Sequence, residues 1–238
     1  MLELRNVNAF YGNSHTIQDV SMRVEPGEFM SVLGRNGVGK TTLMRAILGL
    51  MDRVTGSITL DGREINDKRT DERALAGIGY VPQGRGILPK FTVRENLTLG
   101  TFANAGTAGT SESNGANGFE RVFELFPVLK EFLDRRGGNL SGGQQQQLAI
   151  ARALLTDPTI ILLDEPTEGI QPNIVEKIEQ VLIDLNRVHG LTVMLVEQNV
   201  AFARRASQRF VLMDRGSVAA DGSVEELTDD LVHRHMVV

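Results

Sequence analysis

The stretch GRNGVGKTT, residues 34–42, restricts the possible folds of this 238-residue chain more than any other feature. It matches the spacing G-x-x-x-x-G-K-[ST], and it lies between the apolar run FMSVL at 29–33 and a predicted helix at 40–50. In this strand–loop–helix context, glycines let the backbone curl so that successive N–H groups face a phosphate. The residues predicted to bind phosphates are Gly34, Arg35, Asn36, Gly37, Val38, Gly39, Lys40, Thr41 and Thr42.

Two side chains of this loop have separate predicted roles. Lys40 brings a positive charge to the outer phosphates, and Thr41 offers a hydroxyl to Mg²⁺. The alternative is a glycine-rich turn that binds nothing, and the match of both pattern and context argues against it.

Apolar patterning predicts an α/β fold. Continuous apolar runs at 29–33, 159–163 and 192–196 are typical of strands buried on both faces of a parallel sheet. Helices are expected at 40–50, 174–188 and 200–205. LELRNVNAFYG near the start and VTGSITLDGREI, with its Asp61–Gly62 turn, alternate instead and predict antiparallel strands.

The middle of the chain, residues 91–155, is predicted to be mostly helical. Two capping boxes, Thr92–Glu95 and Ser141–Gln144, mark helix starts. The stretch 101–118 is almost entirely small and polar, so we expect a flexible surface loop there. We expect a single domain over 1–238, with a helical subdomain at about 91–155 between core segments at about 1–90 and 156–238.

Composition limits the possible partners. Thirty acidic against 25 basic residues give a net charge of −5, which argues against nucleic acid as the main partner. The absence of cysteine excludes disulfides and thiolate metal sites. The start of the sequence does not resemble a secretory signal, and the apolar runs are too short to cross a bilayer. We therefore expect no direct membrane insertion, and any work at a membrane would depend on a partner.

Asp164 and Glu165 follow the apolar run at 159–163, at the end of a buried strand where open α/β sheets bind ligands. An aspartate there can hold Mg²⁺ opposite Thr41, and the adjacent glutamate can orient and deprotonate water. Such a pair of acidic residues is often only a strand end facing solvent. Its occurrence together with the phosphate-binding loop makes it a specific signal for a nucleotide site.

NLSGGQQQQLAIARAL, residues 139–154, predicts a second anion site. The Ser141–Gln144 box starts a helix whose first N–H groups point outward, and such a helix start attracts anions. The following glutamines, Gln145 to Gln147, are good helix formers and receive no chemical role.

The loop at 34–42, LSGGQ at 140–144 and LLDEPT at 162–167 together resemble the ABC ATPases over essentially the whole chain. The resemblance implies a RecA-like P-loop core with an antiparallel β subdomain and an inserted helical subdomain. ATP and Mg²⁺ are the implied cofactors. Two subunits would pair head to tail around two ATP molecules, since each chain has one phosphate loop and one LSGGQ stretch at 140–144, the signature of this family.

The resemblance also implies roles for single residues. Tyr11 would stack on adenine, and Gln83 would sense Mg²⁺ and link the core to the helical subdomain. Thr41, Gln83 and Asp164 would contact the metal, and Glu165 would be the general base. Ser141, Gly142, Gly143 and Gln144 would bind the γ-phosphate of the facing subunit's nucleotide. Glu168–Ile170 would touch that subunit, and Gly84–Phe91 would receive a helix of a membrane permease.

Gln198 departs from the general family pattern, which places a histidine at the γ-phosphate. An amide can hydrogen-bond a phosphate, but it cannot take up a proton and become positively charged. LVEQN at 195–199 resembles the second ATPase of branched-chain amino acid and urea importers, and YVPQGR and DEPTEGIQP resemble the urea group. That branch implies a heterodimer with a second ABC ATPase in the cell, although the isolated chain could pair with itself. It also implies permease partners and a place at the cytoplasmic face of the plasma membrane.

Two other readings remain open. One is a non-transport ABC protein of DNA repair or translation; the chain has neither the long coiled coil of the first group nor the paired cassettes of the second. The other is a module that binds ATP without hydrolysing it, which Gln198 keeps open.

Overall fold

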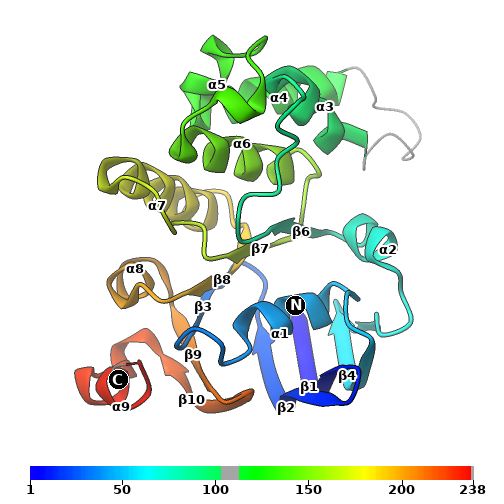
Figure 1. Cartoon of the computed structure of the whole chain (residues 1–238), viewed down its shortest axis with the longest axis vertical. Coiled ribbons are helices and arrows are strands. Elements are labelled where there is room, and N and C mark those ends of the chain that lie inside the picture. The colour runs from blue at the N-terminus through cyan, green and yellow to red at the C-terminus, as the bar shows by residue number, and fades with distance from the viewer. Residues whose placement is uncertain (103–112, 237–238) are drawn as a thin grey trace.

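The computed structural model describes residues 1–102 and 113–236, and its elements form two sheets with helices around them (Figure 1). The smaller sheet is antiparallel in the order β2-β1-β4-β5. Its strands are β1 (Leu2–Tyr11), β2 (Ser14–Val24), β4 (Arg53–Leu60) and β5 (Arg63–Glu64). The turn at Asp61–Gly62 joins β4 to β5, as the alternating pattern predicted.

The larger sheet has six strands in the order β10-β9-β3-β8-β7-β6. All neighbouring pairs are parallel except β9–β10. The strands are β3 (Phe29–Leu33), β6 (Ile78–Val81), β7 (Ile160–Asp164), β8 (Thr192–Glu197), β9 (Arg209–Asp214) and β10 (Ser217–Ser223).

The helices surround the six-stranded sheet (Figure 1). In the described part of the chain they are α1 (Lys40–Ile47), α2 (Thr70–Leu75), α3 (Val93–Thr101), α4 (Ser113–Leu125), α5 (Pro127–Glu131), α6 (Gly142–Leu154), α7 (Pro172–Arg187), α8 (Val200–Ala206) and α9 (Asp229–Met236). Short 3₁₀ turns occur at Gly137–Asn139 and Val224–Glu226. Helices α3 to α6 gather at one end of the molecule, and α1 lies beside the antiparallel sheet at the other (Figure 1).

Alternate residues of the central strands enter two different cores. Ile160 and Leu162 of β7 join the core that packs against α1 and the antiparallel sheet. Ile161 and Leu163 join the core under α3, α6 and α7. Since side chains alternate along a strand, both faces of β7 are buried, and the continuous apolar pattern is explained.

Both predicted capping boxes are present. The Thr92 side chain accepts from the N–H of Glu95 at the start of α3, and Ser141 accepts from the N–H of Gln144 at the start of α6. In each box the side chain of the second residue accepts a hydrogen bond from the backbone N–H of the first.

The predicted loop over 101–118 is wrong at both ends, where the structure has helix instead. Thr101 belongs to α3, and α4 begins at Ser113. Gly118 lies so close to α6 that an added Cβ would be 3.0 Å from Leu155, and Val122 and Phe126 are buried. Tertiary packing of these apolar residues therefore favours helix despite the small, polar sequence before them. The rest of the expected loop, 103–112, lies outside the described residues.

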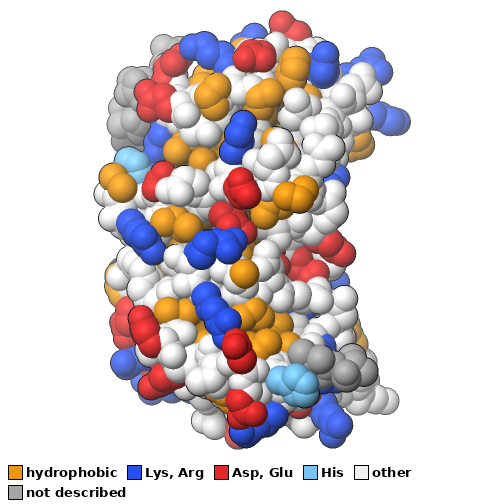
Figure 2. All heavy atoms as spheres, turned by 90° about the vertical axis from the view of Figure 1, so that its left-hand side faces the viewer, with side chains coloured by type: hydrophobic (Ala, Val, Ile, Leu, Met, Phe, Trp, Pro, Cys, Tyr) orange, Lys and Arg blue, Asp and Glu red, His pale blue; other side chains and the backbone are white. Residues whose placement is uncertain are grey.

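The face formed by α5, α7, α8 and α9 carries interspersed acidic, basic and apolar side chains (Figure 2). None of the helices in residues 1–102 and 113–236 combines the length and the apolar character needed to cross a bilayer.

Candidate active site

The register of the parallel sheet brings distant segments to one edge. Leu33 of β3 is level with Glu197 of β8, and Asp164 of β7 is level with Val196. The phosphate loop, the Asp164–Glu165 pair and Gln198 therefore all start at the carboxyl edge, where such sheets bind ligands.

The phosphate loop closes tightly onto its surroundings. Gly34 and Gly39 have φ of 153° and 109°, and a Cβ added at Gly34 would lie 2.6 Å from the carbonyl oxygen of Met213. Gly39 precedes α1 without a side-chain cap, so the first N–H groups of the helix have no side-chain acceptor there. This leaves them available to an anion.

Lys40 is buried and points back over its own loop. Its Nζ donates to the carbonyl oxygens of Gly34 at 2.8 Å and Arg35 at 3.0 Å. It also forms an ion pair with Glu165 Oε1 at 3.2 Å, with both side chains at most 6% exposed. The predicted phosphate cation and the predicted base are therefore in direct contact.

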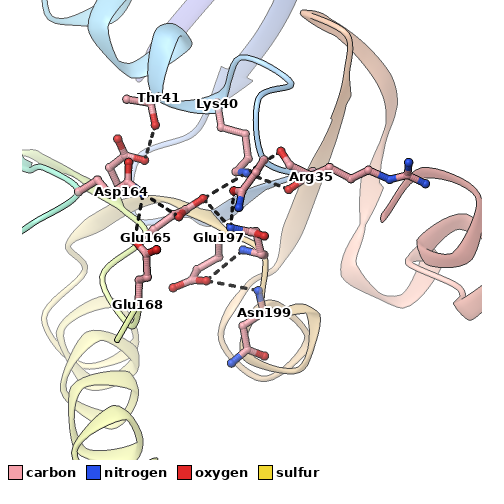
Figure 3. Close-up of polar contacts among 12 residues, drawn as sticks. Arg35, Lys40, Thr41, Asp164, Glu165, Glu168, Glu197 and Asn199 are labelled. Atoms are coloured by element: carbon pink, nitrogen blue, oxygen red, sulfur yellow. Dashed lines mark hydrogen bonds and ion pairs between the residues drawn. The ribbon is translucent and has the colours of Figure 1, made fainter. Parts of the chain in front are cut away.

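Glu165 is the centre of the site (Figure 3). Gln198 Nε2 donates to its Oε1 at 3.0 Å, and Gln83 Nε2 donates to its Oε2 at 3.2 Å. The Gln198 amide also reaches Asn36 Oδ1 of the phosphate loop at 2.6 Å, and Gln83 also reaches Glu168 at 3.0 Å. Two of the three residues predicted to be catalytic, Gln83 and Gln198, thus converge on the carboxylate of the third, Glu165.

The backbone of Glu165 is left-handed, with φ of 47°. A residue with a side chain pays for this conformation, so it persists only where the surroundings fix it. Here the N–H of Glu165 donates to the carbonyl oxygen of Val196 at 2.9 Å.

Asp164 and Thr41 form the candidate metal site. Thr41 Oγ1 donates to Asp164 Oδ1 at 3.2 Å, and Asp164 Oδ2 is buried without a hydrogen-bond partner. Burial raises the pKa of Asp164 to about 6, and the nearby Glu165 carboxylate adds to the rise. A buried carboxylate oxygen and a hydroxyl are hard oxygen donors, so the pair fits Mg²⁺.

Tyr11 lies at the end of β1 and is 39% exposed, next to the phosphate-loop helix. The guanidinium of Arg45, on α1, is 5.6 Å from the centre of its ring. An exposed ring at this place offers a flat face to a planar ligand.

The signature residues are not brought to the phosphate loop. No hydrogen bond or ion pair described for this chain joins 141–144 to 34–42, and α6 lies among the helices at the far end (Figure 1). Ser141 is exposed, and the N–H groups of Gly142 and Gly143 precede the one that Ser141 caps.

The two signature glycines have different surroundings. A Cβ at Gly142 would meet only the Arg85 guanidinium, the flexible end of a long side chain, at 2.8 Å. A Cβ at Gly143 would lie 2.5 Å from Ile174 of α7. Gly143 is therefore needed for helix packing, whereas Gly142 borders the open end of α6.

The glutamines after the signature have contacts that sequence reasoning missed. Gln145 accepts from Arg85 at 2.9 Å and donates to the carbonyl oxygens of Gly137 and Leu140. Arg152, further along α6, donates to Gly86 O at 2.7 Å. Polar residues inside an otherwise apolar helix were the available signal. Two contacts thus join α6 to the segment after Gln83.

Glu197 is the other missed residue. It ends β8 as a 4% exposed carboxylate and has four donors around it. The signal was an acidic residue directly after a buried apolar run, the same signal that identified Asp164.

A family model described as ABC transporter matches residues 17–168. The chain belongs to the ABC transporter ATPases. The high-affinity branched-chain amino acid transport ATP-binding protein BraG of Pseudomonas aeruginosa is 37% identical to this ABC ATPase, over 92% of this chain and 91% of its own. The glutamate/aspartate import ATP-binding protein GltL of Escherichia coli is 35% identical over 97% and 94%.

Solved ABC cassettes share the fold. The dimeric structure of MJ0796, a bacterial ABC transporter cassette, has a TM-score of 0.83 at 31% identity, over 94% of this chain and 99% of that one. A post-hydrolysis state of the same cassette, bound to ADP and Pi, has a TM-score of 0.82 at 31% identity, over 94% and 99%. The predicted fold class is confirmed, and the ABC chain is an ATPase that binds ATP.

Proposed function

We propose that this ABC ATPase drives a membrane importer by Mg²⁺-dependent hydrolysis of ATP, with Glu165 as the general base. The observation that carries this proposal is the convergence of Lys40, Gln83 and Gln198 on the Glu165 carboxylate. A base must lie within hydrogen-bonding reach of its water, and the two amides beside Glu165 can hold a water in that position.

The phosphates would lie on the N–H groups of the loop Gly34–Gly39 and on Lys40, with Tyr11 against the adenine. Thr41, Asp164 and Gln83 would hold Mg²⁺, which neutralises charge on the phosphates when bound. Phosphate oxygens would compete with Glu165 for the Lys40 ammonium, since both are anions. Nucleotide binding would thereby release the Glu165 carboxylate to accept a proton.

The second half of the site would come from another ABC ATPase subunit. Ser141, Gly142, Gly143 and Gln144 would close on the γ-phosphate held by the facing chain, and Glu168–Ile170 would touch that chain. The outward N–H groups at the start of α6 support this arrangement, as does the likeness to a cassette solved as a dimer. In the cell we expect a heterodimer.

Permease subunits would attach the pair to the cytoplasmic face of the membrane. We assign residues 91–155 to a helical subdomain and Gly84–Phe91 to its docking groove. Leu88 and Phe91 are 38% and 42% exposed, whereas Ile87 packs partly against the core. The contacts Arg85–Gln145 and Arg152–Gly86 would transmit motion from this groove to the signature helix.

For the solute we propose urea, with branched-chain amino acids as the alternative. The motifs YVPQGR and DEPTEGIQP support urea, and the likeness to BraG supports the alternative. The solute does not touch this subunit, so uptake must be measured with the permease present. Uptake of labelled urea and labelled leucine, compared in cells with and without this gene, distinguishes the two.

Replacing Glu165 by Gln tests the catalytic proposal. The amide keeps the volume of the side chain but removes the base and one of its two acceptor oxygens. We therefore expect turnover to fall about 1000-fold while ATP binding persists and the closed dimer accumulates. Phosphate release, ATP titration and size-exclusion chromatography measure these effects. Glu176→Gln, on α7 outside the site, is the control. Wild-type turnover in Glu165→Gln would show that the base is assigned wrongly.

A further inference from the structure

Glu197 lies behind the site rather than in it. Its Oε1 accepts from Thr167 Oγ1 at 2.6 Å and from the N–H of Thr167 at 3.3 Å. Its Oε2 accepts from the N–H groups of Gln198 at 3.0 Å and Asn199 at 3.3 Å. One oxygen therefore binds the segment after β7. The other binds the segment after β8, as Figure 3 shows.

These two segments carry the groups that meet at the reacting centre. Thr167 is two residues after Glu165 and one before Glu168, and Gln198 adjoins Glu197 directly. A carboxylate that accepts from both segments holds them together, because a charged acceptor and a buried place both strengthen a hydrogen bond.

The conformation of Glu165 needs such support. Its left-handed backbone, with φ of 47°, is held from one side by the Val196 carbonyl oxygen. On the other side the chain continues to Thr167, which is fastened to Glu197 by two contacts. The Glu165 turn is thus closed at both ends against the same strand, β8.

We propose that Glu197 is a positioning residue that fixes the Glu165 carboxylate relative to the Gln198 amide, and thereby sets the rate of hydrolysis without contacting ATP. The inference rests on the proposed role of Glu165 as the base. Supporting groups of this kind typically change activity about 10- to 100-fold when removed.

Two variants test it in the full chain, assembled with its partner ATPase. Glu197→Gln turns an amide NH₂ toward N–H donors on one side, so one of the two segments loses its acceptor. Thr167→Val keeps the shape of the side chain and removes only the hydroxyl donor. We expect kcat to fall at least about 10-fold in the first variant and several-fold in the second, with ATP Kd unchanged.

The double variant Thr167→Val/Glu197→Gln distinguishes a positioning role from a general loss of stability. If Thr167 and Glu197 act through one contact, the double variant has a kcat no lower than Glu197→Gln alone. Glu179→Gln is the matched control, since Glu179 is also 4% exposed but pairs with Arg205 between α7 and α8. It is expected to lose stability with kcat unchanged.

The outcomes are distinguishable from a failure of the proposed function. Wild-type kcat in both Thr167→Val and Glu197→Gln, with Glu165→Gln inactive, overturns the role of Glu197 and leaves the base in place. Wild-type kcat in Glu165→Gln overturns the base itself. Lowered kcat with unchanged ATP Kd in the Glu197 and Thr167 variants, not shared by Glu179→Gln, supports the inference.

Discussion

The helices α1 and α6 both have a glycine at their start, Gly39 as the N-cap of α1 and Gly142 as the first residue of α6, but the two starts differ in almost every other respect. The start of α1 is buried, lacks a side-chain cap and has the Lys40 ammonium beside it. The start of α6 is open, is capped by Ser141, and has as its neighbouring cation Arg85, which is engaged with Gln145. The first can bind an anion by itself, because it combines charge with free N–H groups. We propose that the second only adds donors to an anion already held by the facing subunit.

Removing the charge at the first start gives the largest expected effect on nucleotide binding. In Lys40→Ala, ATP affinity should fall about 300-fold, because a buried charge-assisted contact to phosphate is lost. A fluorescence or calorimetric titration measures this. Lys68→Ala, which removes an exposed lysine paired with Glu72, is the control. Unchanged affinity in Lys40→Ala would contradict the role of the phosphate loop.

Adding a negative charge at the start of α6 should lower hydrolysis and leave ATP affinity unchanged, whereas Lys40→Ala lowers ATP affinity. Gly142→Asp places a carboxylate in the first turn of α6, where it favours the helix dipole and can pair with Arg85. The same charge repels the phosphate of a facing subunit, so we expect hydrolysis to fall about 100-fold with stability and ATP affinity of the single chain preserved.

Phosphate release and thermal melting of Gly142→Asp and Gly142→Ala together check this prediction. The alanine variant displaces only the end of the Arg85 side chain and serves as the size control. If the aspartate variant hydrolyses ATP as fast as the alanine variant, the signature does not approach a phosphate.

The smallest effects compare the two capping boxes. Thr92→Ala and Ser141→Ala each remove one cap hydrogen bond, and each should lower the free energy of unfolding by about 1 kcal/mol in chemical denaturation. Only Ser141→Ala should also slow hydrolysis, because the α3 start is not part of the site. Equal turnover in both variants would assign Ser141 to folding alone.

Much of this site could be predicted because it depends on local pattern. The strand ends at Leu33, Asp164 and Glu197 follow from apolar runs, and parallel pairing then brings them to one edge. The two helix caps follow from residue types three apart. Each of these features is determined within a few residues of sequence or by a general rule of sheet topology.

Contacts between distant side chains were beyond such reasoning. The Lys40–Glu165 ion pair joins residues whose roles were predicted separately, and the Arg85–Gln145 contact joins segments 60 positions apart. The start of α4 at Ser113 was missed because the helix depends on the packing of later residues, such as Gly118 against Leu155, rather than on local composition.

The Gln198 amide removes one source of acid sensitivity from the site, although Asp164 still has a pKa of about 6. Its hydrogen bonds to Asn36 and Glu165 come from a group that neither gains nor loses a proton at any pH a cell experiences. An imidazole in that place would change its charge close to neutrality. The charge of the side chain at position 198 therefore stays the same when the surrounding medium acidifies.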